Sequence, residues 1–131
     1  MDLGTLRKSL DSLYRSLRAR ASKATIIVVG YPRLFDSQRS CIPGLKPEER
    51  DLLNAVAGRL NRVIASVARA RGFGFADPRA GFAAHGLCSR DRWISPFVAG
   101  KDALRGSFHP NVAGQKALAR IIAGKNPDMF R

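Results

Sequence analysis

The sequence predicts an α/β fold with parallel strands covered by helices, and three segments carry this prediction. Residues 25–31 form a continuously apolar, largely β-branched run without alternation, which is typical of a strand buried on both faces of a parallel sheet. A long amphipathic segment starts near residue 47, and a shorter strand-like segment follows at 73–77. Strand, long helix and strand make a βαβ unit, whose strands run parallel with a right-handed crossover.

Length and composition limit the architecture. The 131 residues are enough for one domain with a real core and too few for two. A hydrophobic content of 45% is ordinary for a folded protein and argues against wholesale disorder. No apolar run approaches a membrane span, and charges interrupt residues 1–20, so we expect neither a transmembrane segment nor a signal peptide in this chain.

The first expected helix precedes the strand at 25–31 and has a leucine stripe at steps of three and four. The stripe is Leu3, Leu6, Leu10, Leu13 and Leu17, with Arg7, Lys8, Arg15 and Arg18 on the other side. Because the repeat is short, it favours packing on a sheet over a coiled coil. After the strand, Pro32 stops the chain, and residues 31–35 should lie near any site, since sites in open α/β sheets lie beyond the carboxyl ends of strands.

The second expected helix opens at Pro47 with acidic residues in its first turn and ends at Gly72. Its expected buried stripe is Leu53, Val56, Leu60, Val63 or Ile64, and Val67. The last helix is expected over 110–123, with Pro110 at its first position and His109 as the N-cap. Its expected inward residues are Val112, Leu118, Ala119 and Ile122.

Two strands and three helices are too few for a complete doubly wound sheet, which usually has four or more strands. The strand at 25–31 would then keep an unpaired apolar edge. Either another chain supplies further strands, or these residues are part of a larger domain.

The charge pattern offers a second functional hypothesis. The formal net charge is +13, from 23 basic and 10 acidic residues, which attracts polyanions. A nucleic-acid- or polyanion-binding module is therefore an alternative. The basic residues are scattered, however, without a dense run, an RNA- or DNA-binding signature or much aromatic interleaving, so we interpret the charge mainly as a solvated surface.

Candidate site residues come from the last quarter of the chain and from the irregular segment 79–106, whose length is typical of functional loops. His109, at a stiff loop-to-helix junction, can be aimed as a general base, or it can simply start a helix. His85 is interpreted as structural, and Asp77 is either a site residue or a turn residue. Cys41 and Cys88 fit no zinc spacing and are either one disulfide or two free thiols.

Several spaced motifs in one order now indicate a family. They are Ile26-Ile-Val-Val-Gly-Tyr-Pro-Arg-Leu-Phe35, Cys41, Gly72-Phe-Gly-Phe-Ala-Asp77, Phe82-Ala-Ala-His-Gly-Leu-Cys88, Trp93-Ile94 and Ser107-Phe-His-Pro-Asn-Val-Ala-Gly114. Together they resemble the SGNH/GDSL hydrolases, most closely the secreted actinobacterial lipase and esterase branch. The resemblance covers residues 3–123 and falls on the C-terminal half of that family's domain, so residues 1–131 are expected to be the C-terminal portion of one domain.

The resemblance implies a three-layer α/β/α, flavodoxin-like fold, here incomplete, and hydrolysis of carboxylic esters by a Ser–His pair without metal or cofactor. It assigns His109 as the catalytic histidine and pairs Cys41 with Cys88 in a disulfide. It places Phe82, Trp93 and Ile94 on the acyl-chain side of the cleft. The partners it implies are a small-molecule or lipid ester and the missing N-terminal half of the domain, and the compartment it implies is extracellular.

This sequence also departs from the family pattern. It has no Gly-Asp-Ser nucleophile motif and no Gly-X-Asn-Asp, so the serine and most of the oxyanion hole are expected before residue 1. The family often has an aspartate three residues before the histidine, where this chain has Gly106. The backbone carbonyl of Gly106 could orient His109 instead, and Asp102 is the less favoured orienting group. Alone, the chain is expected to be inactive or to be a non-functional fragment.

Overall fold

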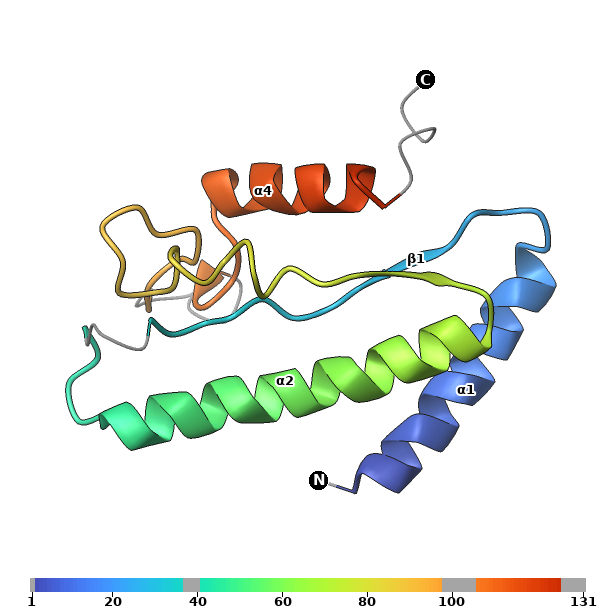
Figure 1. Ribbon diagram of the computed structural model, residues 1–131, viewed down its shortest axis with the longest axis horizontal. Coiled ribbons are helices and arrows are strands. Elements are labelled where there is room, and N and C mark those ends of the chain that lie inside the picture. The colour runs from blue at the N-terminus through green and yellow to red at the C-terminus, as the bar shows by residue number, and fades with distance from the viewer. Residues whose placement is uncertain (1, 37–40, 98–105, 126–131) are drawn as a thin grey trace.

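The computed structural model describes residues 2–36, 41–97 and 106–125. In these residues, three helices accompany a two-stranded parallel sheet (Figure 1). The elements are α1 (Leu3–Arg20), β1 (Ile27–Val29), α2 (Pro47–Ala70), β2 (Gly74–Ala76) and α4 (Val112–Ala123).

The sheet is the predicted βαβ unit, with α2 as the crossover. β1 and β2 pair in parallel, with Val28 opposite Phe75. Both strands have three residues, fewer than the sequence predicted, and the Gly30 N–H extends the pairing by one bond to the Ala76 carbonyl at 2.9 Å. The α/β class and the incompleteness of the sheet are thus confirmed.

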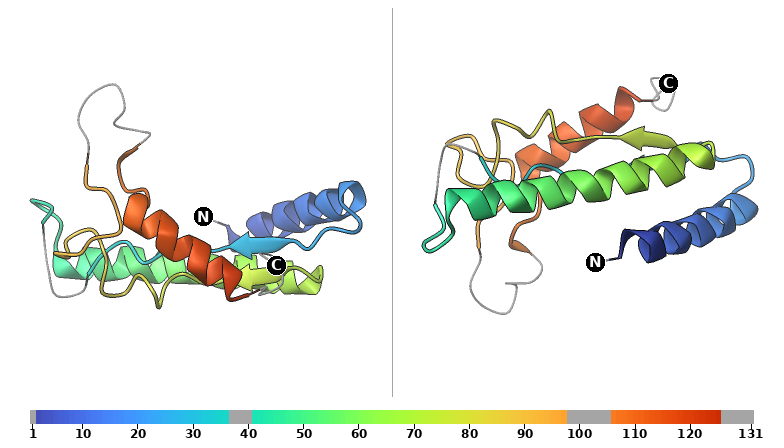
Figure 2. Two further views of the ribbon diagram at one scale, coloured as in Figure 1. Left: turned by 90° about the horizontal axis from the view of Figure 1, so that it is seen from above. Right: turned by 60° about the horizontal axis from the view of Figure 1, so that its bottom comes forward.

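The helices lie in two layers around the sheet. α1 and α2 cover one face and α4 crosses the other, in both Figure 1 and the views of Figure 2. Both strands run toward the end of the molecule where α2 and α4 begin (Figure 1). The loops that follow the strands therefore gather beside the start of α4.

Two groups of buried side chains stabilise the layers. One joins α1, α2 and the sheet through Tyr14, Val67, Ala68 and Phe73. The other lies between α4 and the loops that follow the strands, and it consists of Phe35, Phe82, Leu87, Ile94 and Ala117. The second group makes the irregular segment after β2 part of the core.

The predicted stripe of α1 is wrong in its C-terminal half. Leu13 and Leu17 are exposed, and Tyr14 is buried in their place. The physical reason is the contact with α2, where Arg71 binds Asp11 in two hydrogen bonds of 2.6 and 2.7 Å. This contact turns the side of α1 that carries Asp11 and Tyr14 inward.

The predicted stripe of α2 is wrong in its N-terminal half. Val63, Ile64 and Val67 are buried, as expected, but Leu53 and Val56 are exposed. The short sheet packs against the C-terminal half of α2, through the contacts of Ile64 and Ala65 with Phe75. In the first turns, Arg50 and Asn54 face the loop after β1 instead, and the described residues leave Leu53 and Val56 uncovered.

The start of α4 also differs from the prediction. Asn111, not His109, is the N-cap, and the Asn111 carboxamide oxygen accepts the Gly114 N–H at 3.0 Å. Pro110 lies before the helix because it is held in an antiparallel bridge with Ile94. The inward residues are Gly114, Ala117, Leu118 and Ile121, while the predicted Val112 and Ala119 are exposed.

Candidate active site

The candidate site is built on two short segments that run antiparallel, 93–95 and 108–111. The Ser95 N–H donates to the His109 carbonyl at 2.8 Å, and the Asn111 N–H donates to the Trp93 carbonyl at 2.9 Å. These bonds flank the bridge between Ile94 and Pro110. Because Ile94 is fully buried, this pairing ties the segment before α4 to the core.

The pairing contains a bulge at Phe108 and His109. The Ser95 carbonyl accepts the N–H of Phe108 at 3.0 Å, while the Ser95 N–H donates to His109, so two residues oppose one. This is the hydrogen-bond pattern of a G1 bulge, whose first position is normally a glycine with positive φ. Phe108 holds that position with φ of 62°. Such a backbone costs about 1–3 kcal/mol for a side-chain-bearing residue and is concentrated at functional sites.

The junction after His109 is rigid. The Asn111 carboxamide joins two elements, because its oxygen caps α4 and its nitrogen donates to the Arg92 carbonyl at 2.8 Å. Gly114 packs so closely that a β-carbon there would lie 2.2 Å from the Trp93 carbonyl oxygen. The exposed His109 side chain is thus carried by backbone that is fixed on both sides.

The loop after β1 lies beside this junction and is also held in place. The Leu87 N–H donates to the Leu34 carbonyl at 2.8 Å, and a β-carbon on Gly86 would lie 2.8 Å from the Asp36 nitrogen. Phe35 and Ile94 belong to one buried group. Residues 31–35 and the segment that carries His109 therefore share one end of the molecule, as the sequence predicted.

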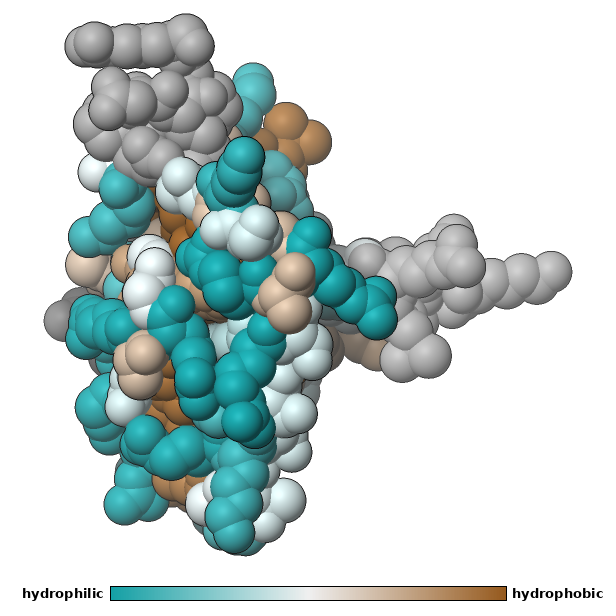
Figure 3. Space-filling view, turned by 90° about the vertical axis from the view of Figure 1, so that its right-hand side faces the viewer, coloured by the Kyte–Doolittle hydropathy of each residue, from teal (hydrophilic) through white to brown (hydrophobic). Residues whose placement is uncertain are grey.

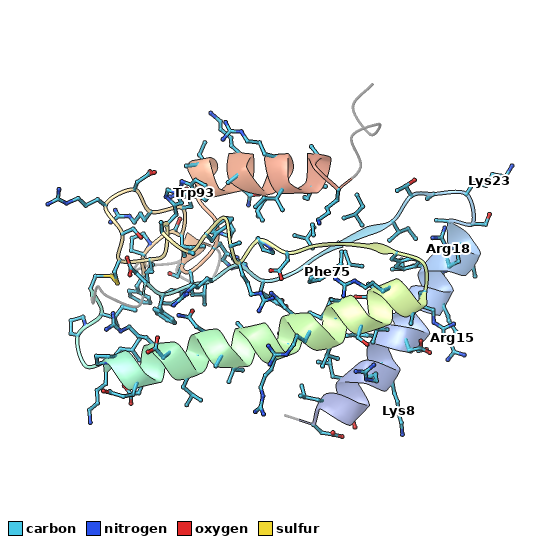
Figure 4. The ribbon with its side chains drawn as sticks, in the orientation of Figure 1. Lys8, Arg15, Arg18, Lys23, Phe75 and Trp93 are labelled. Atoms are coloured by element: carbon cyan, nitrogen blue, oxygen red, sulfur yellow. A yellow bond between two sulfur atoms is a disulfide. The ribbon has the colours of Figure 1, made fainter. Side chains whose placement is uncertain are left out.

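The aromatic residues proposed for the acyl-chain side occupy different depths. Phe82 and Ile94 are 0% exposed, and Trp93 is partly buried. The Trp93 ring meets Phe82 edge-on at 5.1 Å between centroids and stacks on His85 at 3.7 Å. Trp93 lies near the start of α4 (Figure 4). Phe82 and Ile94 thus belong to the buried core, and Trp93 packs against it.

His85 is engaged within its own loop. Its Nδ1 lies 2.8 Å from the Asp91 carbonyl oxygen and 3.2 Å from the Asp91 carboxylate. Its carbonyl accepts the Trp93 N–H at 2.9 Å. These contacts match the structural role expected from the sequence.

Cys41 and Cys88 form the disulfide implied by the resemblance, with their Cα atoms 5.3 Å apart. The bridge connects the chain before α2 to the loop after β2 across 47 residues. Gly106, the other candidate near His109, is partly buried, and Asp102 lies outside the described residues.

Asp77 belongs to a second charged feature, which sequence reasoning assigned only as a site or turn residue. Its carboxylate binds the Arg79 guanidinium at 2.6 Å, and this hydrogen bond lowers the pKa of Asp77 against the opposing effect of burial. The pair lines a cleft of about 580 Å³ between α2 and the loops after both strands. His109 does not line this cleft, so the two features are separate.

α1 contains a short motif that is similar to a nucleophile motif. Leu10-Asp11-Ser12-Leu13 shares three letters with a Gly-Asp-Ser-Leu nucleophile motif. Ser12 is nevertheless in the middle of a helix, with its carbonyl accepting the Ser16 hydroxyl at 3.1 Å. α1 also lies on the opposite side of the sheet from α4 (Figure 1), which separates Ser12 from His109.

Some of the basic side chains form intramolecular contacts. Arg71 binds Asp11, and Arg18 donates to three carbonyls while lying 4.9 Å from the centre of the Phe73 ring. Other basic residues, including Arg15 and Lys23, cover the end of the molecule where α1 leads into β1 (Figure 4). Viewed from that end, the surface is mostly hydrophilic (Figure 3).

No described helix is both long and apolar enough to cross a membrane. Within the described ranges, no three His, Cys, Asp or Glu side chains gather as a metal site would require. The candidate site thus consists of the exposed His109 on the paired segments 93–95 and 108–111, in an α/β protein.

Comparison with known proteins identifies the family of this chain. The model of the GDSL-like lipase/acylhydrolase family matches residues 2–117, so the chain belongs to that family. A lipase of Streptomyces rimosus is 37% identical over 111 residues, which make up 85% of this chain and 40% of the relative. Lipase 1 of Streptomyces coelicolor has the same identity and coverage.

Solved structures agree with the family and the fold. The extracellular lipase of Streptomyces rimosus superposes with a TM-score of 0.84 and 34% identity, over 93% of this chain and 51% of that one. Phospholipase A1 of Streptomyces albidoflavus NA297 gives a TM-score of 0.84 and 35% identity, over 92% and 51%. The chain spans about half of these structures and 40% of the curated relatives. The predicted resemblance to actinobacterial lipases is confirmed.

Proposed function

We propose that this chain supplies the general base and the C-terminal portion of a carboxylic-ester hydrolase domain. His109 takes the proton of a serine hydroxyl as the serine attacks the ester carbonyl, and later returns it to the leaving alcohol. The serine and most of the oxyanion hole come from polypeptide outside these 131 residues, because residues 1–131 contain no Gly-Asp-Ser. The observation that carries the proposal is the bulge at Phe108, which fixes the backbone of His109.

The surroundings of the two histidines favour His109 as the base. His85 is stacked on Trp93 and bound to Asp91. His109 is exposed on a segment that five observations hold rigid: three backbone hydrogen bonds, the Asn111 cap and the packing of Gly114. A base has to be positioned before its pKa matters, so this rigidity is the feature that catalysis requires. In this proposal, the backbone carbonyl of Gly106 orients the imidazole.

The remainder of the domain pairs with the open side of the sheet in this proposal. Val29, the last residue of β1, and Tyr31 just after it are exposed, and Leu13 is exposed on the neighbouring layer. A parallel sheet is normally buried on both faces and extended beyond two strands. The absence of those strands accounts for the apolar surface that this chain leaves uncovered.

The substrate class follows from the relatives. The proteins it resembles are named lipases, one of them extracellular, and one solved neighbour is named phospholipase A1. We infer that the substrate is a lipid or small-molecule ester, bound with Trp93 on the acyl-chain side and with Phe82 and Ile94 behind it. The reaction needs no cofactor or metal, and the disulfide suits an oxidising, extracellular compartment.

Reconstitution of ester hydrolysis tests this proposal. The chain is assayed with a p-nitrophenyl ester, alone and mixed with the part of Streptomyces rimosus lipase that it does not match. We expect negligible turnover alone and measurable turnover in the mixture. His109→Gln should remove the gain, with a loss of at least about a hundredfold, while the matched variant His85→Gln retains it. Robust hydrolysis by the lone chain that survives His109→Gln would refute the assignment.

The two alternatives predict different results. A fragment without function would give no turnover in either arrangement. A polyanion-binding module would bind DNA or RNA tightly in fluorescence anisotropy, with an affinity that falls steeply as salt is raised. The internal use of Arg18 and Arg71 makes this second outcome the less expected one.

A further inference from the structure

Two arginine side chains converge over a glycine in the middle of α2. A β-carbon built on Gly58 would lie 3.1 Å from Nη1 of Arg79 and 3.8 Å from Nη1 of Arg62. The two nitrogens therefore lie within about 7 Å of each other, a gap that one oxyanion can bridge through two charge-assisted hydrogen bonds of about 2.8 Å. Arg62 belongs to α2, and Arg79 belongs to the loop after β2.

The Arg79 guanidinium is held in place by protein groups alone. The Asp77 carboxylate accepts hydrogen bonds from its Nε and Nη2 at 2.9 and 2.6 Å, which leaves Nη1 beside Gly58. A glycine inside an α-helix costs about 1 kcal/mol relative to alanine, and here it gives the guanidinium room to lie against the helix. The fold thus brings two like charges together, and an anion between them would offset their repulsion.

The charges around this point match a dianion. A hollow of about 290 Å³ lies here, and Arg59 lines it together with Gly58, Arg62 and Arg79. Asp77 offsets the charge of Arg79, whereas Arg59 and Arg62 have no hydrogen bond or ion pair within the described ranges. Two positive charges therefore remain uncompensated. The described lining has no carboxylate and no aromatic ring, so it favours a phosphate group over a cation or a stacked nucleic-acid base.

The remainder of the domain is expected at the opposite edge of the sheet. A second hollow, which shares Arg62 and Arg79, is also lined by Phe75 of β2, and no described residue of β1 lines either hollow. Val29 and Tyr31, the exposed residues that further strands would cover, belong to β1 and the loop after it. Burial of an unpaired guanidinium costs several kcal/mol, so packing of polypeptide over these arginines is unfavourable. We therefore expect the hollow to stay open in the complete domain.

We propose that Arg62 and Arg79 bind a dianionic phosphate group over Gly58, with Arg59 adding a third positive charge. The bound group connects α2 to the loop after β2, so it should raise the stability of the folded chain. His109 lines neither hollow, and the inference goes beyond the proposed hydrolysis without depending on it.

Nuclear magnetic resonance titration of the isotope-labelled chain with inorganic phosphate tests the site, at constant ionic strength and slightly alkaline pH. The amide of Gly58 and the Nε–H groups of Arg62 and Arg79 should shift together and reach saturation. Sulfate should act similarly, whereas acetate, with a single charge, should bind at least about fivefold more weakly. Phenyl phosphate shows whether a phosphomonoester or the free ion binds more tightly, and either result supports the site.

Two substitutions in the site should each weaken phosphate binding by about fivefold or more. Arg62→Gln removes one cation, and Gly58→Ala places a methyl group beside Nη1 of Arg79. Arg20→Gln, at an exposed position at the end of α1, removes a charge elsewhere and should bind phosphate like the parent. The rise in melting temperature caused by phosphate should follow the same order. Circular dichroism checks that each variant is folded.

Three results would overturn the proposal. The first is an absence of saturable shifts at Gly58, Arg62 and Arg79. The second is an equal loss of affinity in Arg20→Gln and Arg62→Gln, which would show a diffuse attraction to the net charge of +13. The third is a loss of the shifts when the unmatched part of Streptomyces rimosus lipase is added, which would show that this polypeptide covers the hollow. The titration reports on the two arginines and the ester assay on His109, so either can fail without the other.

Discussion

The side-chain amide of Asn61 binds both main-chain polar groups of Tyr31. Its oxygen accepts the Tyr31 N–H and its nitrogen donates to the Tyr31 carbonyl, each at 2.8 Å. Two turns earlier, Asn54 makes the same pair of contacts with Phe35, at 3.3 and 3.0 Å. Seven helical residues span about 10 Å and four extended residues about 13 Å. α2 therefore holds the loop after β1 extended, as a neighbouring strand would.

Asn61→Ala is expected to destabilise the fold by about 2–3 kcal/mol, because it leaves the N–H and the carbonyl of Tyr31 without their partner. Asn61 is 1% exposed, so water does not readily replace the amide. Urea denaturation measures the change in the free energy of unfolding. Arg59→Ala, at an exposed position of the same helix, is the control and should change stability little. Equal effects of the two substitutions would show that the Asn61 contacts contribute nothing.

Gly114→Ala is expected to displace α4 from the segment at Trp93. The new β-carbon would lie 2.2 Å from the Trp93 carbonyl oxygen, and the Trp93 backbone and the rigid Pro110 ring limit relaxation. A loss of about 1–3 kcal/mol or more is the expected cost of such overpacking. The matched control is Gly124→Ala at the other end of α4, where φ is −65° and the nearest atom would lie at 3.5 Å. A Gly114→Ala protein as stable as this control would contradict the close packing.

The βαβ unit could be predicted because its signals are local: a β-branched run, an amphipathic helix and a second short strand. The buried faces of the helices could not be predicted in this way. Periodicity shows which side of α1 is apolar, but the contact of Asp11 with Arg71 decides that Tyr14 is buried and Leu13 is not. That contact joins residues 60 positions apart, and no local pattern reports it.

Local sequence patterns also predicted only part of the candidate site. His109 could be singled out from its neighbours in sequence, but the N-cap assigned to it belongs to Asn111, because Ile94 holds Pro110 outside the helix. The bulge at Phe108 depends on pairing with Ser95, which again is a long-range contact. Asn61 was missed because a polar residue in an amphipathic helix normally indicates the solvent side, and only its partner Tyr31 explains its burial.

Removal of the disulfide is expected to lower stability by up to about 4 kcal/mol, the loop-closure value for a bridge of this span. The paired variant carries Cys41→Ser and Cys88→Ser, and the melting temperature is measured with and without a reductant. Reduction should lower the melting temperature of the parent and leave that of the double variant unchanged. A parent that is insensitive to complete reduction would contradict a stabilising role for the bridge.

The contribution of the Asp77–Arg79 pair to the free energy of unfolding should be lost as the pH falls. The hydrogen bond from Arg79 lowers the pKa of Asp77 below the usual value of an aspartate, so the pair stabilises the fold at neutral pH. As the pH falls below about 4, the unfolded chain takes up the proton first, and the contribution disappears on reaching the lowered pKa. Because both side chains are partly exposed, the contribution should not exceed about 1 kcal/mol.

Urea denaturation measures this contribution. The free energies of unfolding of the parent and of Asp77→Asn should differ above pH 5 and converge in acid. Asp51→Asn, at an exposed position of α2, gives the background. A difference that persists or grows below pH 3 would show that Asp77 acts through something other than its ionised carboxylate.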